Sequence, residues 1–206
     1  MNKIIKNTLA LTLITTALGT LLGVVHEITL KPIEVQEQLA KDKAYREVFD
    51  SASSFETVSL KEGGLAEKLD QALDAAGYQE ETIDEVTKAL DADGNEAGYV
   101  FTVTTAEGYG GDIQFTLGVT NDGVMQGISF LTIGETAGLG MRADTEDFRK
   151  QFQDRKTEQL TYSKTGASSD DEIDALSGAT ITTNAVTNGV NAGLVAYQIM
   201  MEGGTN

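Results

Sequence analysis

The sequence contains no cysteine, no tryptophan and a single histidine, His26. The absence of cysteine excludes thiolate iron–sulfur clusters, thiolate zinc sites, disulfides and cysteine nucleophiles. With one histidine, the chain also lacks the groups for a histidine-based metal site or a Ser–His triad, so we expect no metal and disfavour a hydrolase. Any redox chemistry must therefore come from a bound organic cofactor.

Basic residues are scarce. The chain has 15 lysines and arginines and 32 aspartates and glutamates, which gives a formal net charge of −17. Nucleic-acid binding needs a basic surface, so no nucleic acid is expected as a partner. The acidic surface also argues against a domain that lies flat on an anionic membrane, and solubility explains it most simply. A hydrophobic content of 40% in 206 residues is ordinary for a folded chain with one domain.

A long uncharged run stands near the N-terminus. Lys3 and Lys6 precede the segment Thr8–Val25, which has no charge and is just long enough to span a membrane as a helix. A cleaved signal peptide shares this pattern, but no small-residue cleavage site is found near its end, which favours a retained anchor. By the positive-inside rule we expect residues 1–7 in the cytoplasm and residues 26–206 on the extracytoplasmic side of the cell membrane, as in a single-pass protein.

The rest of the chain predicts an α+β fold. Pro32 suits the first position of a helix that continues to Phe49. Further helices are expected at Leu65–Ala76, ended by Gly77, at about Asp144–Phe152, with Asp147 completing a cap, and at Thr182–Met201. Strands are expected at Phe55–Leu60, Gly98–Thr105, Asp112–Thr120 and Val124–Thr132, the last two joined by a turn at Asn121–Gly123.

These elements predict an N-terminal transmembrane helix followed by one domain, in which a small antiparallel sheet is flanked by helices. In the last helix, Gly189 and Gly193 lower the intrinsic helix stability. Their presence indicates that this helix packs closely against another element.

Two candidate sites have simple explanations. Asp91–Glu96 is acidic, but its glycine stands fourth rather than sixth, and Thr102 stands where a calcium loop needs glutamate. A polar turn is therefore favoured over a calcium site. His26 follows the anchor and has no partner in the sequence, so a polar residue at the membrane surface is favoured over a proton relay.

A third candidate is Asp174–Thr180, with the sequence DALSGAT, directly before the C-terminal helix. Gly178 lets the backbone approach a ligand, and a helix start presents free N–H groups and the positive end of its dipole to an anion. A phosphate on Thr180 would lie where those amides point. Taken alone, however, the residues favour an ordinary helix start capped by serine and threonine hydroxyls.

The pattern Asp-x-x-Ser-Gly-Ala-Thr closely resembles the flavinylation motif of FMN-binding domains. Such domains occur in the G subunit of the Rnf ion-translocating electron transport complex and in the C subunit of the sodium-pumping NADH:quinone reductase. The resemblance covers nearly the whole chain and includes the anchor, Val25–Thr29 and Gly134–Gly140, where Ala137 replaces the usual proline. The short length resembles the Rnf subunit more than its relative.

The resemblance implies a covalent flavoprotein. In that family a flavin transferase uses FAD to attach FMN through a phosphoester to the last threonine of the motif, which corresponds to Thr180. The other motif residues correspond to Asp174, Ser177, Gly178 and Ala179. The implied function is electron relay in a ferredoxin:NAD oxidoreductase complex that pumps Na⁺ or H⁺, with other membrane subunits as partners and no complete active site on this chain.

Further contacts with the cofactor are expected on two segments. The candidates for lining the isoalloxazine ring are Glu135, Thr136, Gly138 and Leu139. A glycine-rich surface loop without such a role is the alternative for these four residues. Thr182 and Thr183 are candidates for binding the phosphate oxygens, and capping of the helix is the alternative for both.

Two other functions stay open at this stage. The first is an anchored FMN-binding domain of another respiratory chain, which shares the chemistry and differs in its partners. The second is a non-redox extracytoplasmic binding module with a plain threonine-capped helix, which would be colourless.

Overall fold

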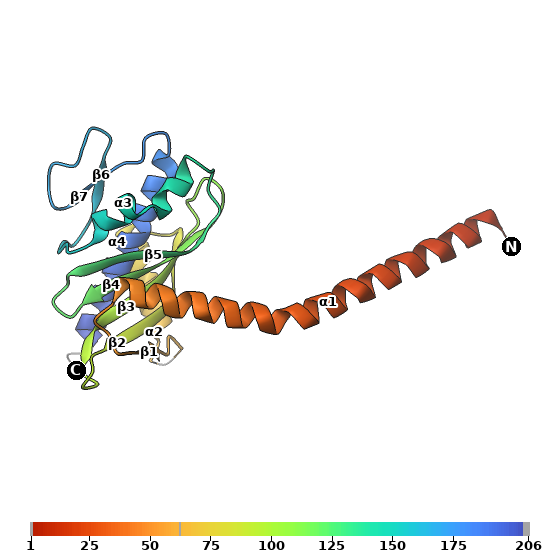
Figure 1. Cartoon of the computed structure of the whole chain (residues 1–206), viewed down its shortest axis with the longest axis horizontal. Helices are drawn as coiled ribbons and strands as arrows, with labels where there is room; N and C mark the ends of the chain where they lie inside the picture. The colour runs from red at the N-terminus through yellow and green to blue at the C-terminus, as the bar shows by residue number, and fades with distance from the viewer. Residues whose placement is uncertain (1, 62, 204–206) are drawn as a thin grey trace. The chain divides into compact units, whose positions relative to one another are not determined.

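The computed structural model describes residues 2–61 and 63–203 (Figure 1). The chain divides into two compact units, Met1–Asp42 and Lys43–Asn206. Met1, expected in the cytoplasm, lies outside the described residues, as do residues 62 and 204–206, which are expected in the extracytoplasmic domain.

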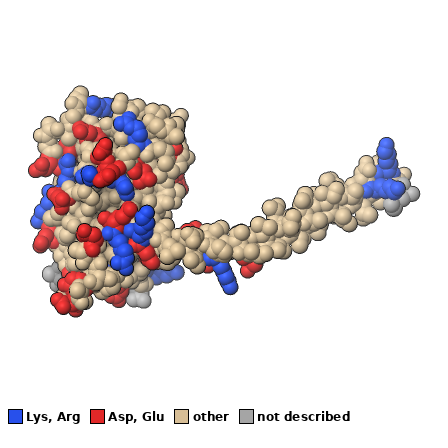
Figure 2. Space-filling model, in the orientation of Figure 1, with Lys and Arg blue, Asp and Glu red and all other residues tan. Residues whose placement is uncertain are grey.

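The first unit consists of most of helix α1 (Lys3–Val48). Its apolar part is exposed along its length. Lys3 and Lys6 belong to its first turns, and Figure 2 shows basic side chains near one end of the helix. Within the described chain, α1 is the helix that is long and apolar enough to cross a membrane. The expected anchor is therefore part of a helix that fits a single-pass membrane protein.

The prediction that a new helix begins at Pro32 is wrong, because Pro32 lies inside α1. Proline has no N–H, so this position loses the bond to the carbonyl of Ile28. The helix continues because only this one bond is lost and the residues on both sides keep their own bonds. The end of the helix, expected at Phe49, falls at Val48.

The second unit is built on a five-stranded antiparallel sheet in which each strand pairs with the next along the chain. The strands are β1 (Ser54–Val58), β2 (Glu81–Leu90), β3 (Glu96–Thr105), β4 (Ile113–Thr120) and β5 (Met125–Ile133). The four strands expected from the sequence are confirmed with small shifts at their ends. The turn Asn121–Gly123 joins β4 to β5, and the Gly123 N–H donates to the Thr120 carbonyl at 2.9 Å.

Strand β2 was not predicted. Its outward positions carry charged residues, among them Glu85 and Lys88, so the strand shows little hydrophobic alternation. The polar turn at Asp91–Glu96, however, is confirmed. It connects β2 to β3, and Asp91 Oδ1 accepts the N–H groups of Asp93 and Asn95 at 2.9 and 2.8 Å.

Helix α4 (Thr180–Gly203) packs on one face of this sheet together with α2 (Leu65–Ala76). A Cβ at Gly189 would lie 2.8 Å from Phe115 Cζ, and one at Gly193 would lie 2.7 Å from Leu117 Cδ2. The predicted close packing of these glycines is therefore confirmed. Gly77 ends α2 in the left-handed conformation, as expected.

The opposite face of the sheet is covered by the last turn of α1 and the residues that follow it. Tyr45, Val48 and Phe49 are buried there against Ala89 and Val100. Alternate residues of β3 thus serve two cores, because Val100 faces this cluster while its neighbour Phe101 faces α4.

The segment expected as one helix over Asp144–Phe152 is made of three short pieces. These are η1 (Gly140–Asp144), α3 (Glu146–Arg149) and η2 (Lys150–Phe152). The cap predicted for Asp144 and Asp147 is wrong, because Thr145 occupies the cap position of α3 and its hydroxyl donates backwards to the Arg142 carbonyl at 2.7 Å. Two short parallel strands, β6 (Thr161–Ser163) and β7 (Glu172–Asp174), then lead to α4.

Candidate functional site

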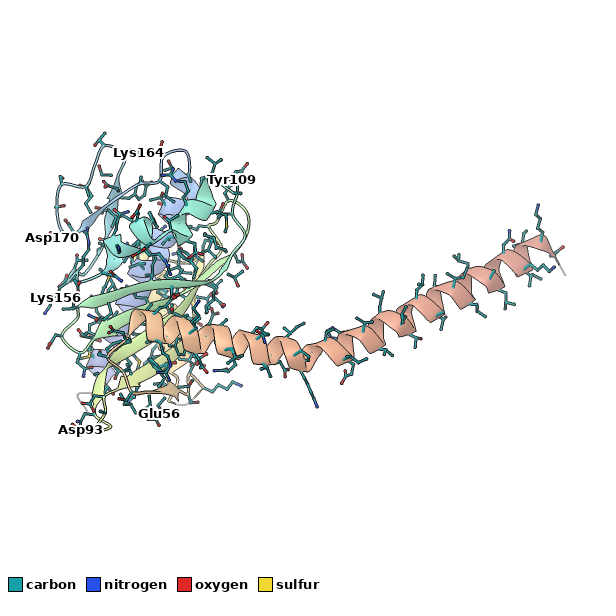
Figure 3. The ribbon with its side chains drawn as sticks, viewed as in Figure 1. Glu56, Asp93, Tyr109, Lys156, Lys164 and Asp170 are labelled. Atoms are coloured by element: carbon teal, nitrogen blue, oxygen red, sulfur yellow. The ribbon has the colours of Figure 1, made fainter. Side chains whose placement is uncertain are left out.

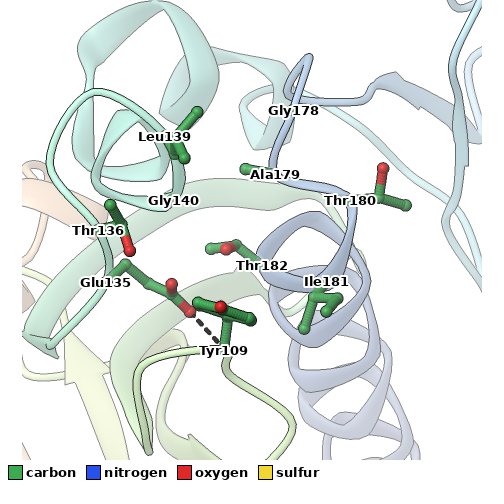
Figure 4. Close-up of a pocket in the computed structure, with 10 residues that line it drawn as sticks. All are labelled: Tyr109, Glu135, Thr136, Leu139, Gly140, Gly178, Ala179, Thr180, Ile181 and Thr182. Atoms are coloured by element: carbon green, nitrogen blue, oxygen red, sulfur yellow. Dashed lines mark hydrogen bonds between the residues drawn. The ribbon is translucent and has the colours of Figure 1, made fainter.

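A cavity of about 590 Å³ lies where three segments of the second unit meet (Figure 4). The segments are the loop between β3 and β4, the loop that follows β5, and the start of α4. The lining residues are Tyr109, Glu135, Thr136, Leu139, Gly140, Gly178, Ala179, Thr180, Ile181 and Thr182. The volume suits a cofactor-sized ligand.

Thr180 is the first residue of α4, two residues earlier than the predicted helix start. The first bond of the helix is donated by the Thr183 N–H to the Ala179 carbonyl at 3.0 Å. The N–H groups of Thr180, Ile181 and Thr182 therefore have no carbonyl partner within the helix. They lie at the positive end of the helix dipole, beside the cavity.

The residue before this helix is Ala179, whose side chain cannot cap the free amides. No bond from these amides to the hydroxyl of Ser177 or Thr180 is found in the described residues. The simple explanation of a helix start capped by these hydroxyls is therefore not supported. Gly178, with a φ of 80°, makes the left-handed turn that leads the chain into α4.

The side chain of Thr183 stabilises this turn through two hydrogen bonds. Its side chain is fully buried, its hydroxyl donates to the Ala179 carbonyl at 2.9 Å, and it accepts the Leu176 N–H at 3.1 Å. Thr183 does not line the cavity. Its hydroxyl therefore binds the motif backbone, whereas Thr182, also buried, lies on the cavity wall.

Glu135 is the acidic residue of the cavity, with 8% of its surface exposed. Its Oε1 accepts the backbone N–H of Tyr109 at 2.8 Å (Figure 4). A Cβ at Gly140 would lie 2.6 Å from both Glu135 Oε2 and Thr182 Oγ1. The polar atoms of Glu135 and Thr182 therefore converge over Gly140, where any side chain would displace them.

Asp174 and Ser177 stand outside the cavity and are exposed. Asp174 Oδ1 accepts the Ala167 N–H at 2.5 Å, and the Asp174 backbone is held on both sides by the side-chain amide of Gln151. The Ser177 carbonyl accepts from the Arg142 guanidinium at 3.3 Å. These contacts fix the path of the motif toward Thr180 and leave its outer side accessible.

The structure thus brings together seven of the residues singled out in the sequence. They are Glu135, Thr136, Leu139, Gly178, Ala179, Thr180 and Thr182. The lining does not include Asp174, Ser177, Gly138 or Thr183. Two lining residues were missed, namely Tyr109 and Ile181, whereas Gly140 belongs to the loop Gly134–Gly140 of the resemblance. The glycines around Tyr109, at positions 108, 110 and 111, were the available signal, because such a loop permits close approach of the backbone.

Comparison with known proteins agrees with this geometry. Residues 108–195 match the FMN-binding domain family, and this span contains all three segments of the cavity. The chain is 31% identical over 197 residues to the G subunit of the Na⁺-translocating ferredoxin:NAD⁺ oxidoreductase complex of Acetobacterium woodii, covering 95% of this chain and 92% of the relative. It is 28% identical over 204 residues to the G subunit of the ion-translocating oxidoreductase complex of Methanosarcina acetivorans, covering 98% and 97%.

A solved structure shares the fold. The C subunit of the Na⁺-translocating NADH-quinone reductase from Parabacteroides distasonis superposes with a TM-score of 0.55 at 20% identity, covering 82% of this chain and 95% of that one. At this identity the similarity establishes the fold alone.

Proposed function

Because this chain belongs to the family of G subunits of ion-translocating ferredoxin:NAD⁺ oxidoreductase (Rnf) complexes, we propose that it carries FMN covalently, through a phosphoester, on the hydroxyl of Thr180. The chain is an electron-transfer flavoprotein subunit of a membrane oxidoreductase, and other subunits of the complex are its partners. This relationship favours the Rnf complex over an unrelated respiratory chain, and the FMN-binding family disfavours a non-redox binding module.

One observation carries the proposal for the attachment site. Thr180 opens a long helix whose first amides are uncapped, and it lies on the wall of a cavity of about 590 Å³. The amides of Thr180, Ile181 and Thr182 can donate to phosphate oxygens, and the helix dipole favours the negative charge there. The cavity leads away from this point toward Glu135 and Leu139.

The other cavity residues would bind the isoalloxazine ring of the flavin through apolar contacts and hydrogen bonds. Leu139 and Ile181 offer apolar surface, and the hydroxyls of Thr136 and Thr182 offer hydrogen bonds that orient it. Gly138, with a φ of 77°, lets the loop turn back so that Leu139 reaches the cavity. Bound FMN supplies the ability to accept and release electrons.

Attachment requires help from another protein. The hydroxyl of Thr180 is a weak nucleophile and needs an activating base. The chain's one histidine, His26, lies on α1 in the other unit. We therefore assign the base to a flavin transferase, for which the exposed Asp174 and Ser177 provide recognition.

The arrangement in the membrane follows from the charges. We propose that residues 8–25 of α1 form the anchor, that residues 1–7 with Lys3 and Lys6 stay in the cytoplasm, and that the domain in residues 26–206 lies on the other side. His26 then stands at the membrane surface.

The test is in-gel fluorescence of the denatured protein after co-expression with a flavin transferase, together with intact-mass analysis. Wild type is compared with Thr180→Val and with the neighbouring Thr182→Val as the matched control. We expect a fluorescent band with the mass of FMN in wild type and Thr182→Val, and a dark band in Thr180→Val. A dark wild-type band with an active transferase would refute the covalent flavin, and fluorescence in Thr180→Val would move the acceptor to Ser177, Thr182 or Thr183.

A further inference from the structure

The rim of the cavity is unusually apolar for an acidic domain. Among the described residues after α1, the large apolar side chains that are exposed are Tyr109, Leu139, Ile181 and Met201. The first three all line the cavity, and each comes from a different one of its three segments. Exposed apolar groups that gather at one place mark a binding surface.

Tyr109 is the aromatic member of this rim, and 71% of its surface is exposed. It stands at the edge of the domain on the loop between β3 and β4 (Figure 3). An aromatic ring offers a flat face of large area that suits another planar ring, preferably in an offset stack.

The backbone that carries this ring is fixed, although the ring itself is exposed. The Tyr109 N–H donates to the buried Glu135, and a Cβ at Gly110 would lie 2.3 Å from the Gly134 carbonyl oxygen. A Cβ at Gly108 would lie 2.1 Å from the Gly111 carbonyl oxygen. The loop is thus closely packed, and it holds Tyr109 at the cavity mouth without burying its side chain.

We propose that Tyr109 covers the isoalloxazine ring of the FMN by stacking on it, on the side of the cavity opposite Leu139. This inference rests on the proposed function, because it takes its occupant from the flavin on Thr180. Figure 4 draws Leu139 and Tyr109 on opposite sides of the cavity, with Thr182 between them. Tyr109 is then a positioning residue that shields the flavin ring from solvent and fixes its plane.

The composition of the chain makes this contact measurable. A phenol in contact with a flavin quenches its fluorescence, because the excited ring takes one electron from the phenol and returns it without net reaction. The chain has no tryptophan, and its other tyrosines, Tyr45, Tyr78, Tyr99, Tyr162 and Tyr197, do not line the cavity. Quenching in the folded protein can therefore be assigned to Tyr109.

The experiment measures flavin fluorescence lifetime on the full-length, FMN-loaded protein in detergent, folded and then denatured. The variants are Tyr109→Phe, which keeps the ring and loses the phenol, Tyr109→Ala, which loses both, and Tyr162→Phe as the control. We expect short lifetimes in folded wild type and Tyr162→Phe, and lifetimes several-fold longer in Tyr109→Phe. Iodide should quench the flavin fluorescence of Tyr109→Ala more strongly than that of Tyr109→Phe, because only the alanine variant loses the aromatic ring that covers the flavin.

Equal lifetimes in wild type and Tyr109→Phe, or equal access of iodide to both variants, would overturn the proposal and leave the ring to solvent or to a protein partner. The denatured samples separate this failure from that of the proposed function. If their fluorescence and mass show FMN on every variant, the flavin is present and the assignment of Tyr109 alone is wrong. If denatured wild type carries no FMN, the proposed function fails and this inference fails with it.

Discussion

The backbone N–H of Tyr109 donates to Glu135 Oε1 at 2.8 Å, and this bond joins two loops that are 26 residues apart in the sequence. Glu135 is buried, lines the cavity and takes part in none of the ion pairs found among the described residues. The bond and the charge can be tested separately.

Glu135→Gln keeps an oxygen that accepts the Tyr109 N–H and removes the charge. We expect FMN loading to persist and the flavin reduction potential to rise, because a negative charge nearby disfavours added electrons by about 1–3 kcal/mol at an effective dielectric constant of about 20. Potentiometric titration of the loaded protein measures this. An unchanged potential would mean that Glu135 acts through structure alone, and Glu135→Ala, which also loses the bond, should load less FMN.

Gly140→Ala should damage the cavity selectively. The added Cβ would lie 2.6 Å from Glu135 Oε2 and Thr182 Oγ1, so we expect a loss of about 1–3 kcal/mol in the free energy of unfolding, typical of overpacking. FMN loading should fall as well. The control is Gly134→Ala, whose Cβ would meet only the Gly110 carbonyl oxygen at an ordinary 3.6 Å. Urea unfolding and in-gel fluorescence measure both effects, and equal behaviour of the two variants would contradict the prediction.

Thr183→Val should separate support of the motif from binding of the flavin. The variant keeps the shape of the buried side chain and loses two bonds, to the Leu176 N–H and the Ala179 carbonyl. We expect a loss of about 1–3 kcal/mol in stability, because the buried Leu176 N–H is left without a partner. FMN loading should be slower and still end at Thr180. Intact-mass time courses during flavinylation would show this, and full loss of loading in a stable variant would instead indicate a direct role.

Glu81 should make stability depend on pH. Burial, and next the nearby Glu107 and Glu80, raise the pKa of this carboxyl, while the Thr105 hydroxyl at 3.1 Å opposes the shift. The folded state therefore binds the proton more tightly than the unfolded state, and the free energy of unfolding falls as pH rises from the ordinary pKa of 4.5 through the raised pKa. Glu81→Gln should flatten this slope and stabilise the domain at neutral pH. Melting temperatures across the range measure it, and an unchanged slope would contradict the assignment.

The orientation of the chain can be read by cysteine labelling, because the sequence has no cysteine of its own. Asn2→Cys and Ser51→Cys place single thiols before the anchor and in the domain, both at exposed positions. We expect an impermeant maleimide to label Ser51→Cys in intact cells and Asn2→Cys only after lysis. The reverse pattern would overturn the proposed arrangement.

Much of the fold could be predicted from local patterns. Helix α2 ends at Gly77 as expected. The glycines of α4 indicated close packing against another element, which the structure identifies as Phe115 and Leu117 of β4. Strand β2 could not be found in this way, because its charged outward residues, such as Glu85, hide the alternation. The continuity of α1 through Pro32 was also hidden, because a helix can lose one bond when its flanks remain helical.

The candidate site could be predicted in part. Thr180 and the loop at Glu135, which line one cavity, were singled out through the resemblance, because their motifs are contiguous in the sequence. Tyr109 was missed because its importance depends on distances between segments that only folding brings together. Thr183 could not be distinguished from Thr182 in the sequence, since the difference lies in the direction that each side chain takes from α4.

The uncapped start of α4 has a consequence for the stability of the protein before FMN is attached. A phosphate on Thr180 that accepts the free amides would act as the missing cap, which is worth about 0.5–2 kcal/mol in typical helices. Attachment would then complete the fold as well as supply the redox centre, so the loaded chain should melt at a higher temperature and resist proteases better than the unloaded one. Cells could thereby clear copies that never received their flavin, with no dedicated sensor beyond the marginal stability of one helix end.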